Sequence, residues 1–204
     1  MKCEKCGGIK KNEFLILNTS SPDRHLDATL DIFEELIKRS DKPWKLAWYY
    51  GFDVFDGVME NNKEMMAWKA DMVARFNALV AEGRAEGGYM INHREIAKKY
   101  LEAGVFLYPT QFYEIHCISA VKAQLAGCKM VTSDFAALNE TVKTGALHTD
   151  GAKWKNGEST FGDNQTDLYV DAILSWGDND VSKEVSEEYN WPNIVKRWQE
   201  LLGT

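Results

Sequence analysis

The sequence predicts an α/β protein with a Rossmann-like, doubly wound parallel sheet, and two observations support this fold class. Short apolar runs alternate with amphipathic segments from Phe14 to Val131, as strands alternate with crossover helices in parallel sheets. Polar loops directly follow two of the apolar runs, and open α/β sheets bind ligands at the carboxyl ends of their strands. The 204 residues, 45% of them hydrophobic, can bury a substantial core.

The net charge and the absence of long apolar runs exclude several classes of binding partner and location. The net charge of −7 argues against a nucleic acid or an acidic membrane surface as the main partner. No apolar run approaches the roughly 18 residues that indicate a transmembrane helix, and the N-terminus lacks the apolar core of a secretory signal. We therefore expect a cytoplasmic protein in which Cys117 and Cys128 are reduced core thiols.

Residues 1–13 are polar, and we treat them as a tail that precedes one domain over residues 14–204. The tail carries Cys3 and Cys6, a spacing found in zinc knuckles and in redox pairs. A structural zinc site needs four ligands, and no second pair of this kind follows. We expect an ordinary tail without a metal; the alternative is a zinc site that two tails complete across a dimer.

The first predicted strand, Phe14–Leu17, runs into a polar loop that contains Ser21, Asp23 and Arg24. The helix after it has apolar residues at spacings of four, three and four: Leu26, Leu30, Phe33 and Ile37. We expect Asp23 to be the N-cap of this helix. Arg24 in the first turn opposes the helix dipole, so it is either a solvated side chain or the partner of a bound anion.

The middle of the chain continues the alternation. Lys45–Tyr50 is predicted as a strand, and residues 61–82 as an amphipathic helix whose Met and Trp side chains belong to the core. Tyr89–Ile91 is predicted as a third strand. Asn92 and Glu95 have the spacing of a capping box, so another helix begins there.

The segment from Tyr108 to Val142 contains the most informative unit. Val105–Tyr108 is predicted as a buried strand and Lys129–Thr132 as the next one. The helix between them has apolar residues at spacings of three, three and four, and Gly127 ends it: Ile115, Ile118, Val121 and Leu125. Glu114 lies at the start of this helix, where unpaired N–H groups favour anions and hydroxyl-rich ligands.

The C-terminal third is predicted to contain shorter elements. We expect a loop over residues 135–140, a strand over 146–148 and a long loop over 150–164. Three helices follow, near Gln165–Trp176, Val181–Glu188 and Trp191–Leu202. Trp191 and Trp198 are seven residues apart, so we expect them to share a face that packs in the core or against another domain.

Residues of the central segment match a known pattern of Pro-Ser/Thr, Glu, a helix with Ala-x-x-x-Gly, and a strand that ends near Asp. They are Pro109, Thr110, Glu114, Ala123, Gly127, Val131, Thr132, Ser133, Asp134, Glu140, Thr141 and Val142. In this pattern the chain resembles the donor-binding, C-terminal domain of the GT-B-fold retaining glycosyltransferases of family 4, or group 1. The resemblance covers residues 14–202 and implies a single GT-B half-domain with C-terminal helices.

The resemblance also implies a ligand, a nucleoside diphosphate sugar, used as donor substrate without a cofactor or metal ion. Glu114 would accept hydrogen bonds from hydroxyls of the sugar, or else only offset the helix dipole. Arg24 would hold the diphosphate. The remaining donor-site positions are Ser21, the backbone of Ile115, His116 and Cys117, and Lys122, with Met90, Ile91 and Asn92 near the base.

Three departures from the family pattern qualify this donor site. Lys122 stands where the family has a second Glu that holds the ribose, and a lysine offers only donors. Asn18 or Thr19 stands where the family has a second cation. The glycines that follow the first Glu in the family are replaced by Ile115, His116 and Cys117, so these positions lack the residue type that lets the backbone approach a ligand closely.

The chain corresponds to only the donor half of a two-domain enzyme. We therefore expect a glycosyltransferase, a hexosyltransferase with an unknown acceptor, that works with a partner chain or a homo-oligomer supplying the acceptor side. The alternative is a non-catalytic sugar-nucleotide-binding or assembly module that pairs with another subunit.

Overall fold

The structure is a computed structural model that describes residues 8–143, 146–148, 153–155, 158–160, 165–175 and 182–203. Its strands are β1 (Asn12–Asn18), β2 (Lys45–Trp48), β3 (Ala85–Gly87), β4 (Ala103–Tyr108), β5 (Lys129–Ser133), β6 (Ala146–His148), β7 (Lys153–Lys155) and β8 (Glu158–Thr160). Its helices are α1 (Leu26–Arg39), α2 (Asp53–Met59), α3 (Lys63–Ala81), α4 (His93–Glu102), α5 (Ile118–Leu125), α6 (Leu138–Thr141), α7 (Gln165–Ser175), α8 (Ser182–Glu188) and α9 (Trp191–Leu202).

Within the described residues, six parallel strands form one sheet in the order β3-β2-β1-β4-β5-β6. The chain first builds outward from β1 to β3 and then returns to build in the other direction from β4. The strand order therefore reverses between the neighbours β1 and β4. In doubly wound sheets a crevice opens at this reversal, outside the carboxyl ends of the two strands. The predicted fold class is confirmed.

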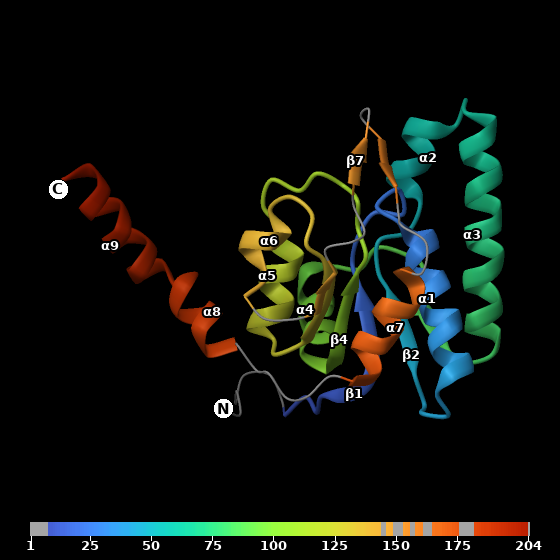
Figure 1. Ribbon diagram of the computed structural model, residues 1–204, viewed down its shortest axis with the longest axis horizontal. Coiled ribbons are helices and arrows are strands. Elements are labelled where there is room, and N and C mark those ends of the chain that lie inside the picture. The colour runs from blue at the N-terminus through green and yellow to red at the C-terminus, as the bar shows by residue number, and fades with distance from the viewer. Residues whose placement is uncertain are drawn as a thin grey trace.

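Helices cover both faces of the sheet (Figure 1). Alternate residues of a strand point to opposite faces, so Ile16 packs with α1, α3 and α7, whereas Leu15 and Leu17 pack with α4, α5 and α6. Each face has its own cluster of buried apolar side chains. The apolar runs of the sequence are therefore strands buried on both sides, as parallel sheets require.

Most of the predicted elements are confirmed, with four differences apart from the helix of the central unit. The third strand, β3, lies four residues earlier than Tyr89–Ile91, because Gly87 and Gly88 adopt positive φ and end it. The helix α2 lies between the predicted strand Lys45–Tyr50 and the predicted helix over residues 61–82, where no element was expected. The helix α6 occupies part of the loop predicted over residues 135–140, so that prediction is wrong for residues 138–140. The antiparallel pair β7–β8 lies inside the long loop predicted over residues 150–164.

The helix of the central unit begins later than predicted. Its first residue is Ile118, four residues after Glu114, and residues 111–117 form a loop instead. The predicted apolar face is wrong for Ile115, Ile118 and Leu125, which are exposed. The prediction is confirmed for Val121, which is buried together with Ala120, Ala123 and Gln124. The predicted end is confirmed, since Gly127 follows the C-cap with φ of 72°.

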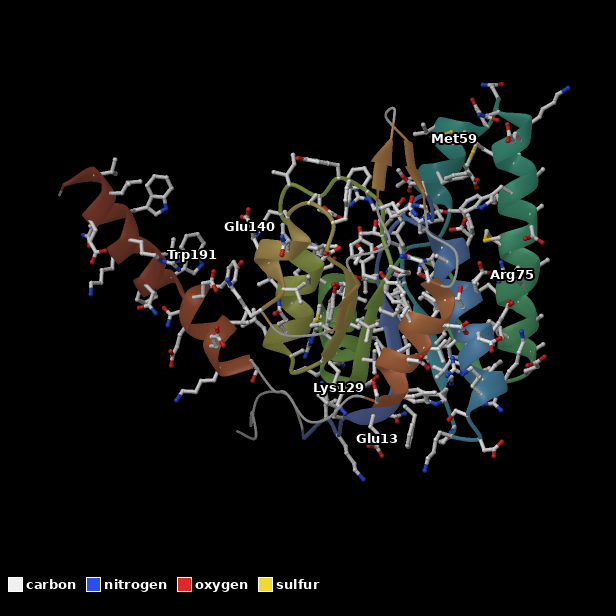
Figure 2. The ribbon with its side chains drawn as sticks, in the orientation of Figure 1. Glu13, Met59, Arg75, Lys129, Glu140 and Trp191 are labelled. Carbon is white, nitrogen blue, oxygen red and sulfur yellow. The ribbon has the colours of Figure 1, made fainter. Side chains whose placement is uncertain are left out.

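The helices α8 and α9 extend away from the sheet as an arm (Figure 1). No residue of α9 is buried, and Figure 2 places Trp191 on this arm. Trp191 is 75% exposed and Trp198 is 58% exposed, so the expectation that they pack in the core of this chain is wrong. The apolar stripe that they share with Val195 and Leu202 has no cover within the described residues.

The N-terminal cysteines Cys3 and Cys6 lie outside the described residues. Among the helices that the structure describes, none combines the length and the apolar character that crossing a membrane requires. Cys117 and Cys128 are buried free thiols, as expected, and burial raises the pKa of each to about 11.

Candidate functional site

The candidate site lies at the carboxyl ends of β1 and β4, and a buried asparagine joins the two strands there. Asn18 ends β1, and its side-chain nitrogen donates to the carbonyl of Leu107 in β4 at 3.1 Å and to Thr29 Oγ1 in α1 at 3.1 Å. Its side-chain oxygen accepts from Ser20 N at 2.8 Å. One side chain thus fixes the loop after β1 against both α1 and β4.

The loop after β1 places Arg24 at the end of a tight turn. Arg24 N donates to the carbonyl of Ser21 at 3.0 Å, and the N-cap of α1 is His25, with φ of 68°. The predicted N-cap at Asp23 is wrong, because the helix begins only after His25. The hydroxyl of Ser21 donates to the carboxylate of Asp23.

The two main predicted residues meet where the strand order reverses. Arg24 Nη1 lies 2.6 Å from Glu114 Oε1, and the hydroxyl of Tyr108 donates to the same oxygen at 2.6 Å. Arg24 comes from the loop after β1, and Glu114 comes from the loop after β4. They are 90 residues apart in sequence, and the adjacency of their strands brings them together.

Phe112 covers one side of the arginine. The central carbon of the Arg24 guanidinium lies 3.7 Å from the centroid of the Phe112 ring, a cation–π contact. Arg24 Nε is buried and donates to no protein group in the described part of the chain. Nε is thus shielded from solvent, and the Nη1 donor is already bonded to Glu114.

The surroundings of this pair hold Tyr108 and Arg24 in their protonated forms. Burial raises the pKa of Tyr108 well above its usual range, and the neighbouring Glu114 carboxylate raises it further. Burial alone would lower the pKa of Arg24, but Tyr108 and Glu114 outweigh it and the net direction is upward. Tyr108 therefore remains a hydrogen-bond donor and Arg24 a cation at physiological pH.

Ile115, His116 and Cys117 lie in the loop before α5, and not in the first turn of the helix as predicted. Because α5 begins at Ile118, the N–H groups of its first turn follow Ile115, His116 and Cys117 in the chain. Ile115 is 90% exposed, and the His116 ring lies 5.9 Å from the ring of Tyr189 near α8. Cys117 is the N-cap of α5 and is buried.

Lys122 lies apart from the arginine–glutamate pair, in a groove of about 360 Å³ between α4 and α5. The groove is mostly apolar and is lined by His93, Ile96, Ala97, Tyr100, Leu101, Lys122, Leu125 and Ala126. Lys122, which was expected near the ribose, lines this groove together with His93. His93 directly follows Met90–Asn92, the segment expected near the base. The side chain of Asn92 caps α4 by accepting from Arg94 N and Glu95 N, which confirms the predicted capping box.

Three contributors to this site were missed from the sequence: Asn18, Tyr108 and Phe112. A polar residue at the carboxyl end of a buried strand is a signal that could have identified Asn18 and Tyr108. Phe112 had no signal, because its contact with Arg24 depends on the loop conformation. Among the described residues, no group of three or more His, Cys, Asp or Glu side chains is arranged to hold a metal ion.

No family model and no curated protein matches the sequence. Solved structures match its fold. The α,α-trehalose-phosphate synthase (UDP-forming) of Burkholderia vietnamiensis has a TM-score of 0.65 at 9% identity, over 98% of this chain and 45% of that one. Anabaena HepE, in complex with UDP and glucose, has a TM-score of 0.60 at 14% identity, over 98% of this chain and 50% of that one.

A third similar structure is a mutant of S. aureus TarM, in complex with Fondaparinux, alpha-GlcNAc-glycerol and UDP. It gives a TM-score of 0.58 at 16% identity, over 95% of this chain and 36% of that one. These neighbours are GT-B glycosyltransferases, and the resemblance found in the sequence is confirmed at the level of the fold. The chain spans half or less of each of these three proteins.

Proposed function

We propose that the chain binds a nucleoside diphosphate sugar at the carboxyl ends of β1 and β4 and serves as the donor half of a retaining hexosyltransferase. The observation that carries this proposal is the meeting of Arg24 with Glu114 at the reversal of strand order. A guanidinium suits a diphosphate, because its planar set of donors matches phosphate oxygens. A carboxylate suits a sugar, because it accepts from hydroxyls.

The roles follow from the charge that each group carries. Transfer of the sugar leaves a nucleoside diphosphate with extra negative charge, and Arg24 stabilises that charge at the leaving group. Glu114, held by Tyr108, orients the sugar through its hydroxyls. In this proposal the cation at the leaving group is Arg24 and no metal ion is needed, so we expect transfer to be unchanged by a chelator.

The groove between α4 and α5 is proposed for the nucleoside. Lys122 and His93 supply polar groups at its wall, and the remaining lining is apolar, which suits the flat faces of a base. Retention of the anomeric configuration and the hexose as transferred group rest on the family resemblance. UDP is the first nucleotide to test, since HepE and TarM were solved with it.

Calorimetric titration of the purified chain with UDP, GDP, ADP and their hexose conjugates tests this function. We expect saturable binding of one nucleotide, weakened by a factor of about 10–100 in Arg24→Ala, and binding of its sugar conjugate weakened by a similar factor in Glu114→Ala. The matched controls are Arg75→Ala and Glu34→Ala, which break another arginine–glutamate pair far from the site. Binding as tight in Arg24→Ala as in wild type contradicts the site, and no binding by wild type at millimolar ligand contradicts the function.

A second candidate is a non-catalytic module that pairs with another subunit, and the arm favours it. The apolar stripe of α9 carries two exposed tryptophans, Trp191 and Trp198, and large exposed apolar patches mark interaction surfaces. A transfer assay on the purified chain, with sedimentation equilibrium in parallel, separates the candidates. Sugar transfer or donor hydrolysis by the chain favours the enzyme, and stable self-association without either favours the module.

A further inference from the structure

The Arg24–Glu114 ion pair affects how tightly the site binds a free nucleoside diphosphate relative to its sugar conjugate, an inference that rests on the proposed function. Arg24 is the cation offered to a diphosphate, yet its Nη1 is already bonded to Glu114 at 2.6 Å. We propose that Glu114 competes with the diphosphate for Arg24, so that the site disfavours a free nucleoside diphosphate relative to a nucleoside diphosphate sugar. Glu114 is thus a specificity-determining residue.

Access to Arg24 is restricted on several sides. Phe112 covers one face of its guanidinium with a centroid distance of 3.7 Å, and Glu114 occupies Nη1. A diphosphate that forms two parallel hydrogen bonds with the guanidinium edge has to displace the carboxylate or share the cation with it. Either arrangement places the negative phosphate beside the negative carboxylate.

The cost of displacement is set by the burial of Glu114. Its side chain is 11% exposed, so water can replace few of the hydrogen bonds that it loses. Without Arg24, the hydroxyl of Tyr108 remains as the donor to this carboxylate among the described residues. A largely buried carboxylate that loses its cation is strongly unfavourable. A free nucleoside diphosphate has no group in this position to compensate.

A sugar on the diphosphate removes that cost. Its hydroxyls are donors, and they replace Arg24 as partners of the Glu114 carboxylate. Binding of the donor therefore exchanges one arginine–carboxylate pair for an arginine–phosphate pair plus hydroxyl–carboxylate bonds. After the sugar leaves, Glu114 loses those hydroxyls and returns to Arg24, which weakens the hold on the nucleotide product and favours its release.

The test compares nucleoside diphosphates with their sugar conjugates in wild type and in Glu114→Gln, by calorimetry with UDP, GDP and ADP and the corresponding hexose conjugates. The amide keeps the shape and the Tyr108 hydrogen bond but removes the charge. We expect affinity for the free diphosphate to rise about five- to tenfold and affinity for the conjugate to fall. Glu34→Gln, which neutralises the partner of Arg75, is the control and leaves both affinities unchanged.

A double-mutant cycle separates competition from simple charge repulsion. Glu114→Gln is repeated in an Arg24→Ala background, where no cation remains to be released. Competition predicts that the gain in diphosphate affinity disappears there, and a gain of the same size overturns the proposal in favour of repulsion. An unchanged or lower diphosphate affinity in Glu114→Gln alone also overturns it. Failure of every nucleotide to bind both proteins instead overturns the proposed function.

Discussion

The loops after β1 and β4 meet at the Arg24–Glu114 pair, but they are held in different ways. The loop after β1 is anchored by buried groups: the Asn18 side chain bonds β4 and α1, and Trp48 Nε1 donates to the carbonyl of Ser20 at 3.0 Å. The loop after β4 exposes the apolar side chains Phe112 and Ile115. The cation is therefore presented by a loop fixed from inside the fold.

The carboxylate depends on its partners at the site. Thr110 Oγ1 accepts from Phe112 N at 3.0 Å, and Ala137 N donates to the carbonyl of Glu114 at 3.2 Å, which fixes only the backbone of the loop. The carboxylate itself is held by Arg24 and Tyr108. The loop that carries Arg24 is therefore held without Glu114, whereas the Glu114 carboxylate depends on Arg24 and Tyr108.

The largest effect should come from Asn18→Ala, which breaks the anchor of the first loop. The substitution leaves the amide of Ser20, the hydroxyl of Thr29 and the carbonyl of Leu107 without their buried partner. We expect unfolding free energy to fall by about 2–3 kcal/mol. Donor binding should weaken as well, since Arg24 loses its fixed loop.

Chemical denaturation and calorimetric titration measure the two effects. The control is Asn77→Ala in α3, where an exposed asparagine is replaced by a better helix former. Stability equal to that control would show that Asn18 does not hold the loop.

Tyr108→Phe tests the second loop and should affect binding more than folding. It removes the hydroxyl that donates to Glu114 at 2.6 Å and keeps the buried ring. We expect the affinity for the sugar conjugate to fall about tenfold, since a hydrogen bond to a charged group contributes about 1.5–3 kcal/mol. The matched control is Tyr49→Phe, which removes a hydroxyl that donates to a different carboxylate, Glu86, at 3.0 Å. Equal losses of affinity in both variants would contradict the assigned role of Tyr108.

The same two loops show what the sequence could and could not predict. The alternation of apolar runs gave the parallel sheet, and the adjacency of β1 and β4 follows from the fold class. Arg24 and Glu114 were therefore predictable as neighbours. The start of α5 was not, because Ile115 and Ile118 have helical spacing but face solvent, while the small residues Ala120 and Ala123 face the core.

The start of α1 was missed for a different reason. Asp23 has the residue type of an N-cap, but His25 adopts the left-handed conformation and takes that position. Residues other than glycine seldom adopt it, so composition favoured the wrong residue. The contact of Phe112 with Arg24 also depends on loop geometry that no periodicity describes.

Phe112→Leu tests how much the aromatic ring of Phe112 contributes to nucleotide affinity by holding Arg24 in place. Leucine keeps apolar cover but lacks the ring that attracts the guanidinium at 3.7 Å. A cation–π contact of this kind contributes about 0.5–1 kcal/mol, so we expect nucleotide affinity to fall about two- to fivefold. Tyr113→Leu removes an adjacent exposed aromatic side chain as the control. If both variants bind like wild type, the ring does not help to position Arg24.

The smallest expected effect is a change in the pH dependence of stability in Asp27→Asn, at the start of α1. Burial alone would raise the pKa of Asp27, but hydrogen bonds from His25 and from backbone N–H groups outweigh it, so the pKa lies below its ordinary value of 3.8. A carboxylate with a depressed pKa in the folded state stabilises the fold above its unfolded pKa, and this contribution is lost as pH falls through the folded pKa. Asp27→Asn should therefore reduce stability at neutral pH and flatten its decline between about pH 5 and pH 2. Denaturant midpoints across that range measure the slope. A decline as steep in the variant as in wild type would show that the His25–Asp27 contact does not stabilise the start of α1.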